Sequence, residues 1–338
     1  MNVIATPAAR KPGDFASDQE VRWCPGCGDY AILKAVQKTL AEIGAKPEST
    51  VFVSGIGCSS RFPYYMATYG FHTIHGRAPA IATGVKMTKP ELDVWVVTGD
   101  GDGLSIGGNH MLHALRRNID LQILLFNNEI YGLTKGQYSP TSRIGTRSPS
   151  SPTGSVEEPV SPAQFALGAG ARFVARAIDT QQKHLVGVLK RARAHRGTSF
   201  VEIFQNCIVY NDDVFGEFTG RASAGQRQIL VEHGKPLLFD GGRQGLRLNV
   251  ERLALEVTAI GEDGAGGGDV LVHDATNKTL AGLLAAMQPP ETPVALGVIY
   301  ESPTATFDAR TDKAPRRTAG ADLLNAILRR GDTWAVET

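Results

Sequence analysis

The four cysteines of this chain are placed as if they act together. Cys24 and Cys27 form a Cys-x-x-Cys pair, Cys58 follows a glycine-rich turn, and Cys207 ends a strand-like run that begins at Val201. Four thiolates are the set that one iron–sulfur cluster requires, and the sequence contains no further cysteine. The cysteine pattern therefore predicts a single cluster whose ligands are far apart along the chain.

Two other uses of these cysteines stay open. Structural zinc is less favoured, because zinc sites usually combine two short knuckles, whereas Cys58 and Cys207 each stand alone. Four unrelated buried thiols are the second alternative. A thioredoxin-like pair is disfavoured because no buried strand precedes Cys24, and disulfides are disfavoured because the N-terminus has no apolar segment for export to an oxidising compartment.

The composition is that of an ordinary globular protein without a strong charge preference. Hydrophobic residues make up 42% of the 338 residues and charged residues 20%, which is enough for a buried core in one large domain or two. The formal net charge of +1 argues against nucleic acid or an anionic membrane as a partner. The sequence contains no run of 18 apolar residues, which a membrane span would need, so a cytoplasmic location is expected.

The apolar pattern predicts a helix over residues 29–43 and a short strand at 51–53. Two buried strands, at 92–97 and 121–126, flank a helix predicted at about 106–117. This order is typical of a βαβ unit, in which the two strands are parallel.

The chain is predicted to have three parts. Residues 1–20 form an N-terminal arm, residues 21–233 the main domain, and residues 234–338 a C-terminal extension. Within the main domain, residues 139–162 are rich in Ser, Thr, Pro and Gly and predict a long loop. The extension is expected to add a small extra layer with three elements: a strand at 270–273, a helix at about 277–287 and a strand at 294–299.

Both strands of the βαβ unit end in residues that suit a magnesium diphosphate. Gly99-Asp100-Gly101-Asp102-Gly103 follows the first strand and Asn127-Asn128 follows the second. Ligands in open α/β sheets bind at the carboxyl ends of the strands, so the two ends should meet at one site. Carboxylate and amide oxygens suit Mg²⁺, and glycine amides suit phosphate. A dinucleotide fingerprint fails because Ile106 stands where glycine is required, and a P-loop fails because no Lys-Ser or Lys-Thr follows.

These segments together resemble the β subunit of the 2-oxoacid:ferredoxin oxidoreductases. The stretch from Gly99 to Asn128 is similar to a thiamine-diphosphate motif, and the likeness runs from about residue 22 to residue 216. Further matching segments are residues 23–29, 55–60, 75–80, 107–110, 130–137 and 139–141. The resemblance implies an α/β, thiamine-diphosphate-binding fold: a mostly parallel sheet flanked by helices, with a small C-terminal extension.

The resemblance also implies which residues bind the cofactors. Cys24, Cys27, Cys58 and Cys207 would hold one 4Fe-4S cluster. Asp100, Asn128 and the backbone carbonyl of Ile130 would hold Mg²⁺. Residues expected to contact thiamine diphosphate are Gly57, Ser59, Ser60, His75, Gly76, Gly99, Gly101, Asp102, Gly103, Asn128, Tyr131, Gly132 and Leu133.

Two residues are candidates for a catalytic role. His75 is expected to contact cofactor or substrate, with a purely structural histidine as the alternative. Lys135 is a candidate partner for the carboxylate of a 2-oxoacid, because an anionic substrate needs a positive group.

The function implied by the resemblance is coenzyme A-dependent oxidative decarboxylation of 2-oxoglutarate to succinyl-CoA, or the reverse carboxylation. Electrons would pass through the cluster to ferredoxin. Pyruvate or branched-chain 2-oxoacids stay open as substrates, as does a non-redox thiamine-diphosphate decarboxylase or synthase. The chain offers no candidate for the glutamate that such cofactors require, so we expect activity only with an α subunit, as an αβ unit or its dimer.

Overall fold

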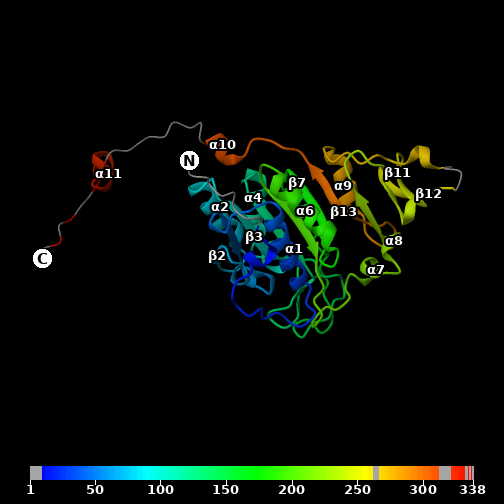
Figure 1. The fold of residues 1–338 in the computed structure, drawn as a ribbon, viewed down its shortest axis with the longest axis horizontal. Coiled ribbons are helices and arrows are strands. Elements are labelled where there is room, and N and C mark those ends of the chain that lie inside the picture. The colour runs from blue at the N-terminus through cyan, green and yellow to red at the C-terminus, as the bar shows by residue number, and fades with distance from the viewer. Residues whose placement is uncertain (1–9, 262–265, 312–320, 332–333, 335, 337–338) are drawn as a thin grey trace, which may run out of the picture.

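An eight-stranded sheet forms the centre of the computed structural model, which describes residues 10–261, 266–311, 321–331, 334 and 336 (Figure 1). All neighbouring strands in it are parallel except β7 and β13. In spatial order the strands are β2 (Tyr69–His72), β1 (Thr50–Ser54), β3 (Asp93–Gly99), β4 (Gln122–Asn127), β8 (Ser199–Phe204), β7 (Phe173–Ile178), β13 (Val294–Glu301) and β9 (Gln228–Val231). The predicted α/β fold with a mostly parallel sheet is confirmed.

Helices cover both faces of the sheet, because alternate side chains of each strand point to opposite faces. Trp95 belongs to the core beneath α1 (Asp29–Glu42) and α6 (Gln182–Ala194), whereas its neighbour Val96 belongs to the core on the other face. The helices of that second face are α2 (Ala78–Thr88), α4 (Gly108–Arg117), α5 (Pro162–Gly168) and α9 (Lys278–Ala286). Strands buried on both faces explain the nearly continuous apolar runs of the sequence.

The predicted βαβ unit is present. β3 and β4 are parallel neighbours, with Gly99 opposite Phe126 at their carboxyl ends. The helix expected from about residue 106 begins at Gly108, because a short helix, α3 (Asp100–Leu104), and a turn come first. The loop expected at 139–162 is also confirmed, since it joins β6 (Gln137–Tyr138) to α5.

The C-terminal part differs from the expected extra layer. β13 does not form a separate layer: it is an inner strand of the main sheet, where it pairs with β7 and β9. The strand expected at 270–273 is absent from the described structure, because only Val272 makes a bridge, to Pro236. A separate antiparallel sheet consists of β10 (Leu238–Phe239), β11 (Gln244–Asn249) and β12 (Ala254–Ala259). The domain boundary at residue 233 stays a prediction.

The described part of the N-terminal arm packs against the main domain. Phe15 is fully buried, and Ala16 forms a bridge with Met66. The remaining short elements are β5 (Ile130–Tyr131), α7 (Gly216–Thr219), α8 (Ala224–Arg227), α10 (Phe307–Thr311), α11 (Ala321–Leu328) and the 3-10 helices η1 (Pro12–Phe15), η2 (Pro47–Ser49), η3 (Ser59–Tyr65), η4 (Asp240–Gly242) and η5 (Gly267–Asp269). No helix among the described residues is both long and apolar enough to cross a membrane.

Candidate functional site

A cavity lies at the carboxyl ends of β3 and β4, where the sequence predicts one site. We call it the strand-end cavity. Most of the residues expected to contact a cofactor or Mg²⁺ line it. They are Gly57, Ser59, His75, Gly99, Asp100, Gly101, Asp102, Asn128, Ile130, Tyr131, Gly132 and Leu133. Residues from at least three distant segments of the chain therefore meet at one place.

The expected magnesium ligands lie on two adjacent segments of this cavity. Asp100 begins α3 and is buried, and burial raises the pKa of its carboxyl group above the ordinary value. Asn128 follows β4, and its side-chain oxygen accepts a hydrogen bond from the backbone N–H of Ile130 at 3.2 Å. A carboxylate, an amide and a backbone carbonyl are the oxygen donors that suit Mg²⁺, so the residues present fit this ion.

Asp102 connects three segments around the cavity. Its carboxylate accepts hydrogen bonds from the backbone N–H groups of Ile56 at 3.0 Å and Gly76 at 2.8 Å, and from the hydroxyl of Thr98 at 2.7 Å. Nδ1 of His75 lies 2.9 Å from the same carboxylate. Asp102 therefore fixes the positions of the loops after β1 and β2 and lies beside the imidazole of His75.

Two glycines are required by close approaches at this site. A Cβ atom on Gly101 would lie 2.2 Å from the ring of Tyr131, whose hydroxyl donates to the carbonyl of Gly101 at 3.0 Å. Gly76 has a positive φ of 69°, and a Cβ atom there would lie 2.4 Å from the backbone nitrogen of Gly107. Both positions therefore need glycine for space, and Gly76 also needs it for its backbone conformation.

Four predicted residues do not line the strand-end cavity: Ser60, Gly76, Gly103 and Lys135. Gly103 is buried against Thr98 and Met111, and the carbonyl of Ser60 accepts a hydrogen bond from Ser54 at 2.6 Å. Lys135 lies in the turn between β5 and β6, with its backbone N–H donating to Gly132. Their proposed contacts with cofactor or substrate stay predictions.

The four cysteines line a second cavity of about 220 Å³, which we call the cysteine cavity. Cys24 is exposed at its rim, and the other three thiols are partly buried. Among the described residues, no group of three or more His, Cys, Asp or Glu side chains forms the site of a single metal ion. The four cysteines line one common cavity, and four thiolates are the donor set that an iron–sulfur cluster requires. Gln205 donates to the sulfur of Cys27 at 3.3 Å.

The thiols lie in a setting that favours their neutral form. Burial raises the pKa of Cys58 to about 12 and also raises the pKa values of Cys27 and Cys207. The nearby charge of Asp29 adds to this effect at each of the three. Thiolates here therefore need the positive charge of bound metal to hold them.

The two cavities share part of their lining. Cys58, Asn128, Gly132 and Leu133 line both. A Cβ atom on Gly132 would lie 3.4 Å from the sulfur of Cys207 and 3.6 Å from that of Cys58. The two cavities are therefore adjacent, with Cys58 and the segment of residues 132–133 in their shared wall.

Comparisons with known proteins agree with this arrangement. Residues 55–203 match the family described as thiamine pyrophosphate enzyme, C-terminal TPP binding domain. The 2-oxoglutarate oxidoreductase subunit KorB of Mycobacterium tuberculosis is 48% identical over 99% of this chain and 91% of its own length. The 2-oxoglutarate synthase subunit KorB of Methanocaldococcus jannaschii is 43% identical over 62% of this chain and 77% of its own length.

A solved structure extends the likeness to the whole fold. It is the 2-oxoglutarate:ferredoxin oxidoreductase from Magnetococcus marinus with 2-oxoglutarate, coenzyme A and succinyl-CoA bound. The TM-score is 0.76 at 33% sequence identity, and the match covers 96% of this chain and 97% of that one. This chain belongs to the 2-oxoacid:ferredoxin oxidoreductase β-subunit family.

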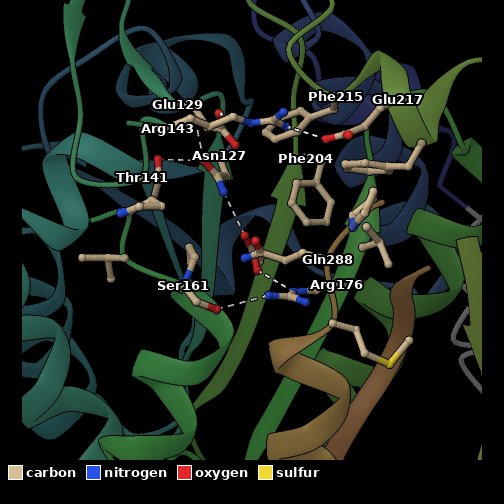
Figure 2. Close-up of a pocket in the computed structure, with 18 of the residues that line it drawn as sticks. Asn127, Glu129, Thr141, Arg143, Ser161, Arg176, Phe204, Phe215, Glu217 and Gln288 are labelled. Carbon is tan, nitrogen blue, oxygen red and sulfur yellow. Dashed lines mark hydrogen bonds and ion pairs between the residues drawn. The ribbon is translucent and has the colours of Figure 1, made fainter. Parts of the chain in front are cut away.

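The structure also shows polar residues near the site of this β subunit that the sequence did not point to. A third cavity, of about 360 Å³, is lined by Asn127, Glu129 and Thr141 among others (Figure 2). Asn127 and Glu129 flank Asn128 of the strand-end cavity in the sequence, and Thr141 donates to Asp100 of that cavity. Its wall holds a buried ion pair between Arg176 of β7 and Glu202 of β8, with 2.8 Å between Nε and Oε2. The available signals were two charged residues, Arg176 and Glu202, each inside an otherwise apolar run.

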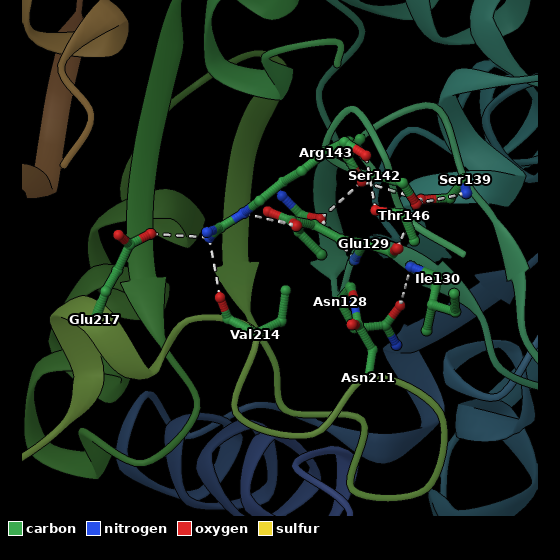
Figure 3. A network of polar contacts seen from close by, with 12 residues as sticks. Asn128, Glu129, Ile130, Ser139, Ser142, Arg143, Thr146, Asn211, Val214 and Glu217 are labelled. Carbon is green, nitrogen blue, oxygen red and sulfur yellow. Dashed lines mark hydrogen bonds and ion pairs between the residues drawn. The ribbon is translucent and has the colours of Figure 1, made fainter. Parts of the chain in front are cut away.

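The turn that carries the expected magnesium ligands Asn128 and Ile130 is held by residues that line this third cavity. Glu129, between Asn128 and Ile130, has a positive φ of 55°, which is uncommon for a residue other than glycine. Its carboxylate pairs with Arg143, which also pairs with Glu217 (Figure 3). Burial raises the pKa of Glu129 to about 7, and the Arg143 guanidinium opposes that rise.

Proposed function

We propose that this chain is the β subunit of a 2-oxoglutarate:ferredoxin oxidoreductase. With an α subunit it would convert 2-oxoglutarate and coenzyme A to succinyl-CoA and carbon dioxide and pass two electrons to ferredoxin, or run this reaction in reverse. The observation that carries the proposal is the shared wall of the strand-end cavity and the cysteine cavity. The names of the relatives support 2-oxoglutarate as the substrate.

The proposed cofactors are thiamine diphosphate with Mg²⁺ and one 4Fe-4S cluster. Asp100, Asn128 and the carbonyl of Ile130 would hold the ion, and the four cysteines would hold the cluster. Bound thiamine supplies the nucleophile for decarboxylation, and the cluster accepts electrons singly.

The chain's own residues have defined tasks in this proposal. Asp102 holds the loop that carries His75 through the backbone N–H of Gly76, so the imidazole stays at the cavity. Because Gly132 has no side chain, its backbone can line both cavities and lie close to the sulfurs of Cys58 and Cys207. Cys24 is exposed at the rim of the cysteine cavity, so we expect ferredoxin to bind on this side and to accept electrons there.

The test uses the chain co-expressed with its α subunit and purified without oxygen. We expect about four iron atoms per β chain and coenzyme A-dependent reduction of a viologen dye, fastest with 2-oxoglutarate when pyruvate and branched-chain 2-oxoacids are compared. A preference for another 2-oxoacid would correct the substrate. Turnover without iron or coenzyme A would contradict the redox reaction itself.

Two variants separate the two cofactor sites. Asp100→Asn should keep its iron but bind Mg²⁺ and thiamine diphosphate about 100-fold more weakly, because a buried ligand charge is lost, worth about 3 kcal/mol. Cys207→Ser should lose the cluster's visible absorption and still bind thiamine diphosphate. Loss of both properties in either variant would show that the two sites do not act separately.

A further inference from the structure

Asn127 directly precedes one of the two segments that carry the expected magnesium ligands, the turn of residues 128–130. It is the last residue of β4 and is buried. Its side-chain oxygen accepts a hydrogen bond from the backbone N–H of Glu129 at 3.3 Å and one from the hydroxyl of Thr141 at 3.1 Å. The same hydroxyl donates to Asp100 at 2.6 Å, and its single proton serves one of these two oxygens at a time.

The amide of Asn127 can point in only one direction. Its nitrogen donates to Oε1 of Glu202 at 2.9 Å, and a carboxylate accepts hydrogen bonds but cannot donate them. Glu202 is held in turn by Arg176, and both are buried, with 1% and 4% of their surface exposed. Because the nitrogen must face Glu202, the oxygen must face Glu129 and Thr141 (Figure 2).

We infer that Asn127 is a positioning residue for the magnesium site and that the Arg176–Glu202 pair sets its orientation. This inference rests on the proposed function, since it takes Asp100, Asn128 and Ile130 as the ligands of the ion. Asn127 contacts the turn of residues 128–130 directly and shares the hydroxyl of Thr141 with Asp100. It therefore helps to position the two ligand segments without being a ligand.

The turn at residues 128–130 needs such support. The positive φ of Glu129 costs free energy and persists only where surrounding contacts hold it. Ser142 donates to the carbonyl of Glu129, and Asn211 donates to the carbonyl of Asn128 at 2.8 Å (Figure 3). Asn127 adds a contact with Thr141, whose hydroxyl also reaches Asp100, beside the hydrogen bond from Tyr131 to the carbonyl of Gly101.

The test uses the αβ complex with Mn²⁺ in place of Mg²⁺, because bound Mn²⁺ reports both affinity and ligand geometry by electron paramagnetic resonance. In Asn127→Ala and Asn127→Asp we expect Mn²⁺ and thiamine diphosphate to bind about 10- to 100-fold more weakly, with a changed spectrum for the bound ion. Iron content should not change. Glu202→Gln should show a smaller loss, since its amide group permits the reversed orientation of Asn127.

Asn118→Ala is the matched control, because Asn118 is also buried and accepts a backbone hydrogen bond, from Thr198 at 3.0 Å, at the opposite end of β4. It should lower the thermal midpoint and leave Mn²⁺ binding unchanged. The inference is overturned if the Asn127 variants bind Mn²⁺ with wild-type affinity and spectrum, or if Asn118→Ala weakens binding equally. A wild-type complex that binds neither Mn²⁺ nor thiamine diphosphate would overturn the proposed function as well, so the two failures are distinguishable.

Discussion

At the scale of single residues, the strand-end cavity requires glycine at positions where a side chain would collide with another residue of the site. Gly101 is the clearest case. The ring of Tyr131 occupies the space that a Cβ atom would take, and its hydroxyl donates to the carbonyl of Gly101. Residue 101 must therefore be glycine, because the methyl group of alanine would collide with the ring of Tyr131.

Gly101→Ala should displace Tyr131 and destabilise the protein by about 1–3 kcal/mol, as overpacked substitutions do. Thiamine diphosphate should bind more weakly, because the moved ring and the backbone beside Asp100 both line its cavity. The measurements are chemical denaturation and calorimetric titration with the cofactor. Gly187→Ala is the control: no atom lies within 4 Å of its Cβ position on α6, so it should be neutral or slightly stabilising. Equal effects in both variants would contradict the collision at Tyr131.

At the scale of elements, one carboxylate holds the loops that follow two paired strands, β1 and β2. Asp102 lies on α3, yet its oxygens accept from Ile56 after β1 and Gly76 before α2. Buried N–H groups without partners are costly, so the loops stay in place as long as Asp102 does. His75 belongs to this unit through its contact with the same carboxylate.

Asp102→Ala should release both loops, at a cost of about 1–3 kcal/mol for each buried donor left unpaired. The backbone amides of Ile56 and Gly76 should then exchange with deuterium faster, while those of β3 and β4 keep their protection. Asp102→Asn retains one acceptor oxygen for these amides and should have a much smaller effect. Unchanged exchange at Ile56 and Gly76 in the alanine variant would rule out this role.

At the scale of the whole molecule, the sheet is completed by strands from the C-terminal third. β13 pairs with β7 on one side and with β9 on the other. Within the described residues, β9 has no other neighbour in the main sheet. The predicted boundary at residue 233 therefore cuts between a strand and its partner.

A chain that ends at residue 233 should not fold, because it exposes the edge of β7 and leaves β9 unpaired. We expect low solubility and no cooperative unfolding by circular dichroism. A chain that ends at residue 311 keeps all eight strands and should unfold cooperatively. Cooperative unfolding of the shorter chain would support an independent domain that ends at residue 233.

Local patterns in the sequence were enough to predict the elements and much of the site. The spacing of apolar residues and the polar residues that follow each strand located β3, α4 and β4. Parallel pairing of the two strands then implied that Asp100 and Asn128 meet. The place of β13 was not predictable, because its apolar run does not say which strands it pairs with. Asn127 and Glu202 are 75 residues apart, so their contact depends on the order of strands in the sheet.

Gly132 has a consequence for the speed of the proposed reaction. It lines the cavities on both of its sides, and the sulfurs of Cys58 and Cys207 lie within van der Waals distance of where its side chain would begin. Because Cys58 lines both cavities as well, electrons would have only a short distance to travel from the strand-end cavity to the cysteine cavity. A larger residue at position 132 would press its side chain against the sulfurs of Cys58 and Cys207 and disturb this route.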